Sequence, residues 1–296
     1  MKTSFKAHLM LTAGALIGAF NFTISKMVMP EFIKPLAIVL TRGILSTIIF
    51  TLIHYFFVKE AIKKEDYLRI FLSALFGIAI NQMTFYEGLN LTTPINASLM
   101  MTITPIFVLL ISSLLLKERI TIIKIIGVLL GSIGAALLIL HSGKASVTGI
   151  FSGDFLVLIN AICWACFLVT TKPLMQRYNP FTILKWIFLI GFFMVLPFGY
   201  QDFITTKWES LTMEAWGALA FVLIFATLFA YYLNSAVLKF VNPSIAGSYI
   251  YLQPLLASII AITWGIDSFS FEKMGYLIII LSGVYLVNFR KNKETI

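Results

Sequence analysis

Long apolar runs alternate with short polar connections along nearly the whole chain. A membrane-spanning helix needs about 20 predominantly apolar residues, and ten segments of the sequence meet this requirement. They are residues 7–29, 35–57, 67–90, 94–116, 122–141, 153–175, 181–200, 214–238, 243–264 and 272–289. The pattern therefore predicts an all-α polytopic membrane protein with ten transmembrane helices.

The fourth and ninth segments share a pattern of prolines. Pro94 and Pro105 recur 149 positions later as Pro243 and Pro254. The first proline of each pair opens its helix, where the missing N–H costs nothing. The second lies within the helix, where it removes a backbone hydrogen bond and bends or breaks the helix. Because a freed carbonyl in hydrocarbon needs another donor, we expect Pro105 and Pro254 to kink their helices at the wall of a cavity.

The prolines belong to a longer internal repeat. At an offset of 146 positions, Ala15, Ala19 and Lys26 of the first segment match Ala161, Ala165 and Lys172 of the sixth. A stretch with glycines and serines at 142–152 then separates a first repeat, 1–141, from a second, 153–296. Five helices is an odd number, so the second repeat is expected to be inverted in the membrane. Inverted repeats are typical of secondary transporters, whose substrate site lies near the bilayer midplane.

The distribution of lysine and arginine predicts the orientation. Sixteen of these residues fall in loops and helix ends on the side of the two termini, and five fall on the opposite side. By the positive-inside rule both termini are cytoplasmic. The net charge of +9 is spread over short loops rather than gathered in an arm or stripe, so no nucleic-acid partner is expected.

Composition and motifs narrow the functional class. The chain is 59% hydrophobic and 12% charged, far from the composition of a soluble domain. Cys163 and Cys166 lie in one apolar run and offer neither a disulfide framework nor a metal-binding spacing. The three histidines are scattered, and no P-loop or nucleophile elbow is present. No catalytic residue, metal or cofactor is therefore predicted.

Polar and aromatic residues near the centres of the spans are candidates for lining a substrate cavity. Any one of them is more often explained by hydrogen bonding between packed helices. As a group spread over several helices, however, they indicate a polar and aromatic cavity. The candidates are Asn81, Thr104, Trp164, Tyr231 and Gln253, with Asn21, Asn160 and Tyr249 as further members. Gln82 has the same central position as its neighbour Asn81.

Two charged residues fall inside the predicted spans. Arg42 lies about two turns into the second segment, and Glu87 lies near the outer end of the third. Charged residues within a span are functional hypotheses by default, so either the two pair or Arg42 binds an anionic group of a substrate. The alternative is an interfacial anchor or a purely structural ion pair.

Several motifs, taken in order, resemble a known family. They are KERIT after the fourth segment, GVLLGSIGAALLIL in the fifth, GDFLVLINAICWACFLVTTK in the sixth and LSGVYLVN in the tenth. In this order and spacing the chain resembles the EamA family of the drug/metabolite transporter superfamily. That pattern has an acidic residue after the fourth and ninth helices, here Glu118 and Asp267, and the aspartate departs from it. The resemblance implies a cytoplasmic-membrane carrier of small metabolites, often an exporter of amino acids, that works by alternating access.

The expected function is therefore secondary transport, in the export direction, of an amino acid or related solute. Its partners would be a small-molecule substrate, membrane lipid and possible coupling protons; no oligomeric state is predicted. A multidrug exporter or a lipid-linked sugar flippase of the same fold is the first alternative, and facilitation without ion coupling stays open. A membrane-embedded enzyme or a receptor is less favoured, because an acid/base cluster and extramembrane domains are both missing from the sequence.

Overall fold

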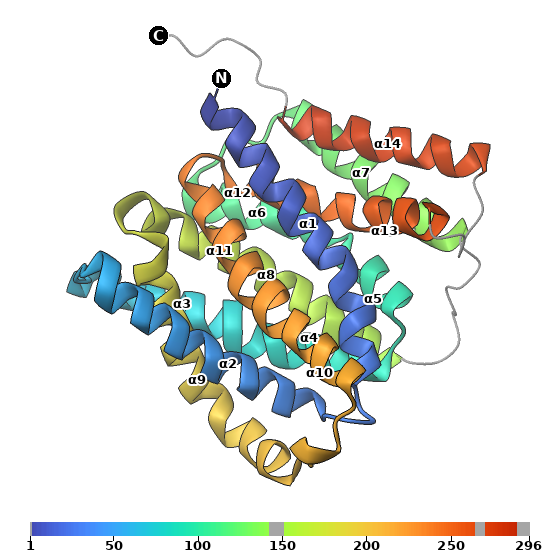
Figure 1. The fold of residues 1–296 in the computed structure, drawn as a ribbon. Coiled ribbons are helices and arrows are strands. Elements are labelled where there is room, and N and C mark those ends of the chain that lie inside the picture. The colour runs from blue at the N-terminus through green and yellow to red at the C-terminus, as the bar shows by residue number, and fades with distance from the viewer. Residues whose placement is uncertain (1, 142–150, 264–269, 289–296) are drawn as a thin grey trace.

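The computed structural model describes residues 2–141, 151–263 and 270–288 (Figure 1). Within these ranges the protein is helical and contains no strand. The α-helices are α1 (Lys2–Val28), α2 (Pro35–Ile53), α3 (Tyr67–Ala74), α4 (Ile80–Leu91), α5 (Pro94–Met101), α6 (Thr104–Leu116), α7 (Ile122–His141), α8 (Phe151–Arg177), α9 (Pro180–Thr205), α10 (Met213–Leu223), α11 (Ala230–Ala236), α12 (Pro243–Ser248), α13 (Leu252–Thr263) and α14 (Phe271–Asn288). Asp267 and residues 142–150 of the expected linker lie outside the described residues.

Helix occupies each apolar segment that the sequence predicts, with boundaries that differ by a few residues. In the described part of the chain, seven helical stretches are long and apolar enough to cross a membrane, and α7 and α14 are shorter apolar helices. Large apolar side chains such as Leu114, 79% exposed, and Phe193, 61% exposed, lie on their outer faces. Such a surface suits lipid rather than water. The chain is therefore a multi-pass membrane protein.

Both segments with paired prolines are interrupted. α5 ends at Met101, the turn Thr102–Ile103 follows, and Pro105 lies in the first turn of α6. In the second copy, a 3-10 turn at Tyr249–Tyr251 separates α12 from α13, which contains Pro254. Proline cannot donate to the helix ladder and its ring displaces the preceding turn, so each long helix divides into two short ones.

Two further helices contain a wide turn at corresponding places. α3 continues into α4 through a π-helical turn at Leu75–Ala79, and α10 continues into α11 through another at Ile224–Phe229. Leu75 and Ile224 are again 149 positions apart. A π turn inserts extra backbone into an α-helix and re-aims the side chains that follow, and such turns are frequent at functional sites.

The helices pack with three prominent pairs. α7 lies along α14, α2 lies along α9, and α4 lies along α8. Figure 1 shows the first two pairs at opposite edges of the bundle, with α1, α8 and α11 between them. The middle of the bundle is therefore walled by helices from both halves of the sequence.

Glycines allow the closest of these contacts. A Cβ atom built on Gly283 of α14 would lie 2.5 Å from the Gly131 backbone nitrogen and 2.7 Å from the Gly127 carbonyl oxygen of α7. Both distances are shorter than any ordinary contact, so only glycine fits there. Gly127 and Gly131 are four residues apart, a spacing that puts both on one face of α7 and permits close helix packing.

Replacing Gly283 by alanine should destabilise the protein by about 1–3 kcal/mol, because an inserted methyl group must push α7 and α14 apart. The measurement is equilibrium unfolding in mixed detergent micelles, followed by tryptophan fluorescence. Gly275→Ala in the same helix is the matched control, since no atom from another described helix lies within 4 Å of its added Cβ. Equal stability of the two variants would contradict this account of the α7–α14 contact.

Candidate functional site

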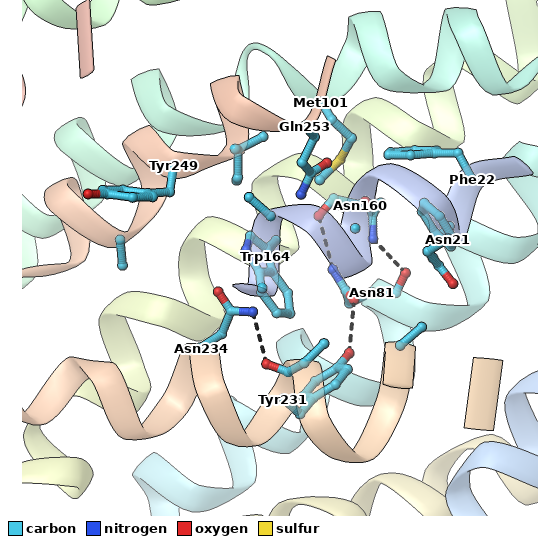
Figure 2. Close-up of a pocket in the computed structure, with 18 of the residues that line it drawn as sticks. Asn21, Phe22, Asn81, Met101, Asn160, Trp164, Tyr231, Asn234, Tyr249 and Gln253 are labelled. Atoms are coloured by element: carbon cyan, nitrogen blue, oxygen red, sulfur yellow. Dashed lines mark hydrogen bonds between the residues drawn. The ribbon is translucent and has the colours of Figure 1, made fainter. Parts of the chain in front are cut away.

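A cavity of about 120 Å³ lies in the middle of the bundle. We call it the central cavity; its wall comes from α1, α2, α4, α5, α8, α11, α12 and α13 and from the turns beside the last three. Figure 2 shows its amide and aromatic side chains converging from these helices. The polar and aromatic lining residues are Asn21, Phe22, Arg42, Asn81, Gln82, Phe85, Asn160, Trp164, Tyr231, Asn234, Tyr249 and Gln253.

The interrupted helices contribute directly to this wall. Met101 is the last residue of α5, Tyr249 and Ile250 belong to the 3-10 turn, and Gln253 is in the first turn of α13. The backbone near the first break finds a donor outside its own helix, because the Ser132 hydroxyl donates to the Thr102 carbonyl at 3.3 Å. The proline breaks thus expose backbone and side chains to the cavity while neighbouring helices supply hydrogen bonds.

Asn81 of α4 and Asn160 of α8 bind each other reciprocally. The Asn81 side-chain nitrogen donates to the Asn160 backbone carbonyl at 3.2 Å, and the Asn160 side-chain nitrogen donates to the Asn81 carbonyl at 2.9 Å (Figure 2). Both residues are buried. These two buried hydrogen bonds from side-chain amides fix the separation and the rotation of α4 relative to α8. The two helices come from different halves of the sequence.

Tyr231 of α11 forms the polar and aromatic floor of the cavity. Its hydroxyl donates to the Gly77 carbonyl at 2.7 Å and accepts from the Gln82 side-chain nitrogen at 3.2 Å. Its ring packs edge-on against Trp164 and Phe188, with centroid distances of 5.5 and 5.1 Å. Gly77 lies within the π-helical turn of the first half of the sequence. Tyr231, from the second half, therefore hydrogen-bonds to the backbone of that turn.

Gln253 and Asn234 approach α1 at its two glycines. A Cβ atom on Gly18 would lie 2.5 Å from the Gln253 side-chain nitrogen, and one on Gly14 would lie 3.2 Å from that of Asn234. Asn234 donates to the Ala230 carbonyl at 2.9 Å. Gln253 has no hydrogen-bonding partner among the described residues, so its amide is available to a bound solute.

The structure brings together most of the residues that the sequence marks as cavity lining. Asn21, Asn81, Asn160, Trp164, Tyr231, Tyr249 and Gln253 line the central cavity, and so does Arg42. Thr104 does not: it is fully buried beside Pro105, and its hydroxyl lies 3.9 Å from the Met101 sulfur. Because the helix is broken just before it, the Thr104 side chain packs between α6 and neighbouring helices instead of facing the cavity.

The two intramembrane charges are separated. Glu87 is half-buried on α4 and is not part of the cavity wall. Arg42 instead donates to the Thr227 hydroxyl and the Ala226 carbonyl. An Arg42–Glu87 ion pair, one of the two functional hypotheses for these residues, is therefore not formed here.

Asn234 is a polar lining residue that sequence reasoning missed, as it missed the aromatic residues Phe22 and Phe85. Asn234 lies four residues from the end of its predicted span, where an amide is usually interfacial, whereas the π-helical turn and the short α11 place it beside the cavity. Gln82 has a recognisable signal, a central amide beside Asn81. Within the described part of the chain, no three His, Cys, Asp or Glu side chains gather as a metal site.

A comparison with protein-family models identifies the family, and individual relatives are named as transporters or as WAT1-related proteins. The model of the EamA-like transporter family matches residues 5–140 and 151–289. An uncharacterized transporter of Archaeoglobus fulgidus is 27% identical over 68% of this chain and 69% of its own length. A WAT1-related protein of Arabidopsis thaliana is 23% identical over 93% of this chain and 81% of its own. A crystal structure at 15% identity superposes with a TM-score of 0.74, covering 95% of this chain and 96% of its own, which indicates a shared fold.

Tyr231→Phe should lower the free energy of unfolding by about 1–3 kcal/mol, because it removes the buried hydrogen bond to the Gly77 carbonyl and leaves the Gln82 side-chain nitrogen without its acceptor. Unfolding in mixed micelles measures the loss. Tyr200→Phe, at a position that is 54% exposed, is the matched control and should change stability little. A Tyr231→Phe variant as stable as this control would show that the hydroxyl does not tie α11 to α4.

Proposed function

Because the chain belongs to the EamA-like transporter family, we propose that it is a secondary transporter built from two inverted five-helix repeats, residues 1–141 and 153–296. It moves a small metabolite, such as an amino acid or a related solute, out of the cell by alternating access. Its ten helices cross the cytoplasmic membrane with both termini inside, as the excess of lysine and arginine on that side favours.

The observation that carries the proposal is the composition of the central cavity wall. The cavity lies where helices of the two halves meet, and side chains from both halves line it: Asn81 and Gln82 from the first, Trp164 and Tyr231 from the second. Substrate sites of inverted-repeat transporters lie at the interface of the repeats, near interrupted helices. Amides and aromatic rings there can bind a solute through hydrogen bonds and ring contacts, so that binding does not depend on charge alone.

Matching contacts at two helix ends support the inverted repeat. The Lys26 ammonium donates to the carbonyls of Leu89 and Thr92 at 2.9 and 3.2 Å. The Lys172 ammonium donates to the carbonyls of Leu238 and Val241 at 2.6 and 3.0 Å. Lysines 146 positions apart thus bind carbonyls 149 positions apart. Cations at helix C-termini satisfy the last carbonyls and the negative end of the helix dipole.

The size of the cavity favours a small solute. A cavity of about 150 Å³ in another protein holds benzene, and the central cavity has about 120 Å³. This volume suits a small metabolite. Alternating access would use the interrupted helices, whose short pieces can tilt separately at the Thr102–Ile103 break and at the Tyr249–Tyr251 turn.

The direct test is solute flux with purified protein in liposomes, using labelled amino acids and related metabolites with and without an imposed proton gradient. Saturable flux that accumulates solute only with the gradient supports coupled transport, and saturable flux that merely equilibrates indicates a facilitator. Flux stimulated by hydrophobic cations or by lipid-linked sugars, with none of any small metabolite, would replace this proposal by the multidrug or flippase function.

Gln253→Leu should leave the protein folded and abolish or redirect transport. No described residue hydrogen-bonds to its amide, so the substitution breaks no internal hydrogen bond, whereas it removes a polar group from the cavity wall. Gln201→Leu, at an exposed position on α9, is the matched control and should transport normally. Unchanged kinetics in a correctly inserted Gln253→Leu variant would remove this residue from the site.

A further inference from the structure

Arg42 is a buried cation with only neutral partners. It is 4% exposed and lines the central cavity. Its Nε donates to the Thr227 hydroxyl at 2.7 Å and its Nη2 donates to the Ala226 carbonyl at 3.2 Å. The guanidinium carbon lies 4.8 Å from the centre of the Tyr86 ring. These contacts hold the group in place but leave its positive charge uncompensated.

The acidic residues on α4 and α9, two helices that pack against α2, do not neutralise Arg42. Asp202 of α9 pairs with Lys34 at 3.0 Å, and Glu87 of α4 forms no ion pair with Arg42. Burying a charge without an opposite one is strongly unfavourable. An anionic ligand bound in the cavity would supply the missing opposite charge, which would explain why a cation is buried at this position.

The guanidinium group also keeps hydrogen-bond donors in reserve. Arginine has five N–H groups, and two of them have acceptors in the structure, which leaves three. A carboxylate takes two parallel N–H bonds from arginine, a geometry that adds both strength and selectivity. Arg42 therefore has the charge and the free donors to bind one carboxylate.

Two buried acceptors in the same wall lack a donor. The side-chain oxygens of Gln82 and Asn160 have no hydrogen-bond partner, whereas their nitrogens donate to Tyr231 and Asn81. An unsatisfied buried carbonyl is costly, and both residues line the central cavity. A solute with an ammonium or hydroxyl group would supply the missing donors.

We propose that Arg42 binds the carboxylate of the transported solute while Gln82 and Asn160 accept hydrogen bonds from its ammonium or hydroxyl group. The inference rests on the proposed transport function and specifies its substrate class. The solutes are small acids with one carboxylate and an adjacent N–H or O–H donor, such as α-amino acids and 2-hydroxy acids. Thr227 and Tyr86 are positioning residues that orient the guanidinium group.

The test uses the full chain in liposomes with the labelled amino acid that gives the highest saturable wild-type flux. Its competitors are the matching 2-hydroxy acid, which keeps the carboxylate, and the matching C-terminal amide, which lacks it. We expect the amide to inhibit at least about 30-fold less well than the acid, since it leaves Arg42 buried without a counter-charge.

Variants at Arg42 separate binding from folding. Arg42→Gln should raise the KM of the amino acid at least about 30-fold and remove the preference for the acid over the amide. Arg42→Lys should be intermediate, because lysine keeps the charge and loses the paired donors. Arg69→Gln, at an exposed position on α3, is the matched control and should keep wild-type kinetics.

Two outcomes overturn the inference: an unchanged KM in Arg42→Gln, or equal inhibition of the wild type by the acid and its amide. The second comparison needs no variant, so it decides the matter even when Arg42→Gln does not fold. A wild-type protein that transports other small metabolites but no amino acid or 2-hydroxy acid also overturns the inference, whereas one without saturable flux of any small metabolite contradicts the proposed function itself. That result differs from saturable flux that is indifferent to the carboxylate.

Discussion

The fold depends on satisfying the backbone where two membrane helices are broken. Pro105 and Pro254 remove hydrogen bonds in a medium that offers no water to replace them, so neighbouring side chains must do so. The single proton of the Ser132 hydroxyl goes either to the Thr102 carbonyl at 3.3 Å or to the Tyr251 hydroxyl at 2.8 Å, and the Tyr251 hydroxyl donates to the Val128 carbonyl at 2.9 Å. These contacts connect the first break, α7 and the second break.

Close helix packing follows from the same constraint. The Tyr251 ring reaches Val128 only because Gly131 has no side chain; a Cβ there would lie 2.4 Å from the ring. On the other side of the cavity, Gly14 and Gly18 leave room for the amides of Asn234 and Gln253. Small residues therefore place polar groups at the cavity, and the polar groups in turn secure the interrupted backbone.

The sequence predicts the helical segments well, because an apolar run of about 20 residues has few other structures available in a membrane. It also points to the proline breaks and to most of the polar cavity wall. It marks Thr104, which does not line the central cavity in this structure, and passes over Asn234, because the direction of a side chain depends on the local winding of the helix. An almost uniformly apolar helix carries no amphipathic stripe from which that direction can be read. The partners of Arg42 are equally hidden, since they come from a π-helical turn 185 positions away.

The number of residues in the π-helical turns at Leu75–Ala79 and Ile224–Phe229 determines which side chains face the cavity. Each α-helical residue rotates the chain by about 100°, so removing one residue from either turn would restore a regular helix and present a different face. Asn81 and Gln82 follow the first turn, and Tyr231 and Asn234 follow the second. Relatives that differ by a single residue there would line their cavities with other side chains, so that a one-residue insertion or deletion can change selectivity as strongly as any substitution.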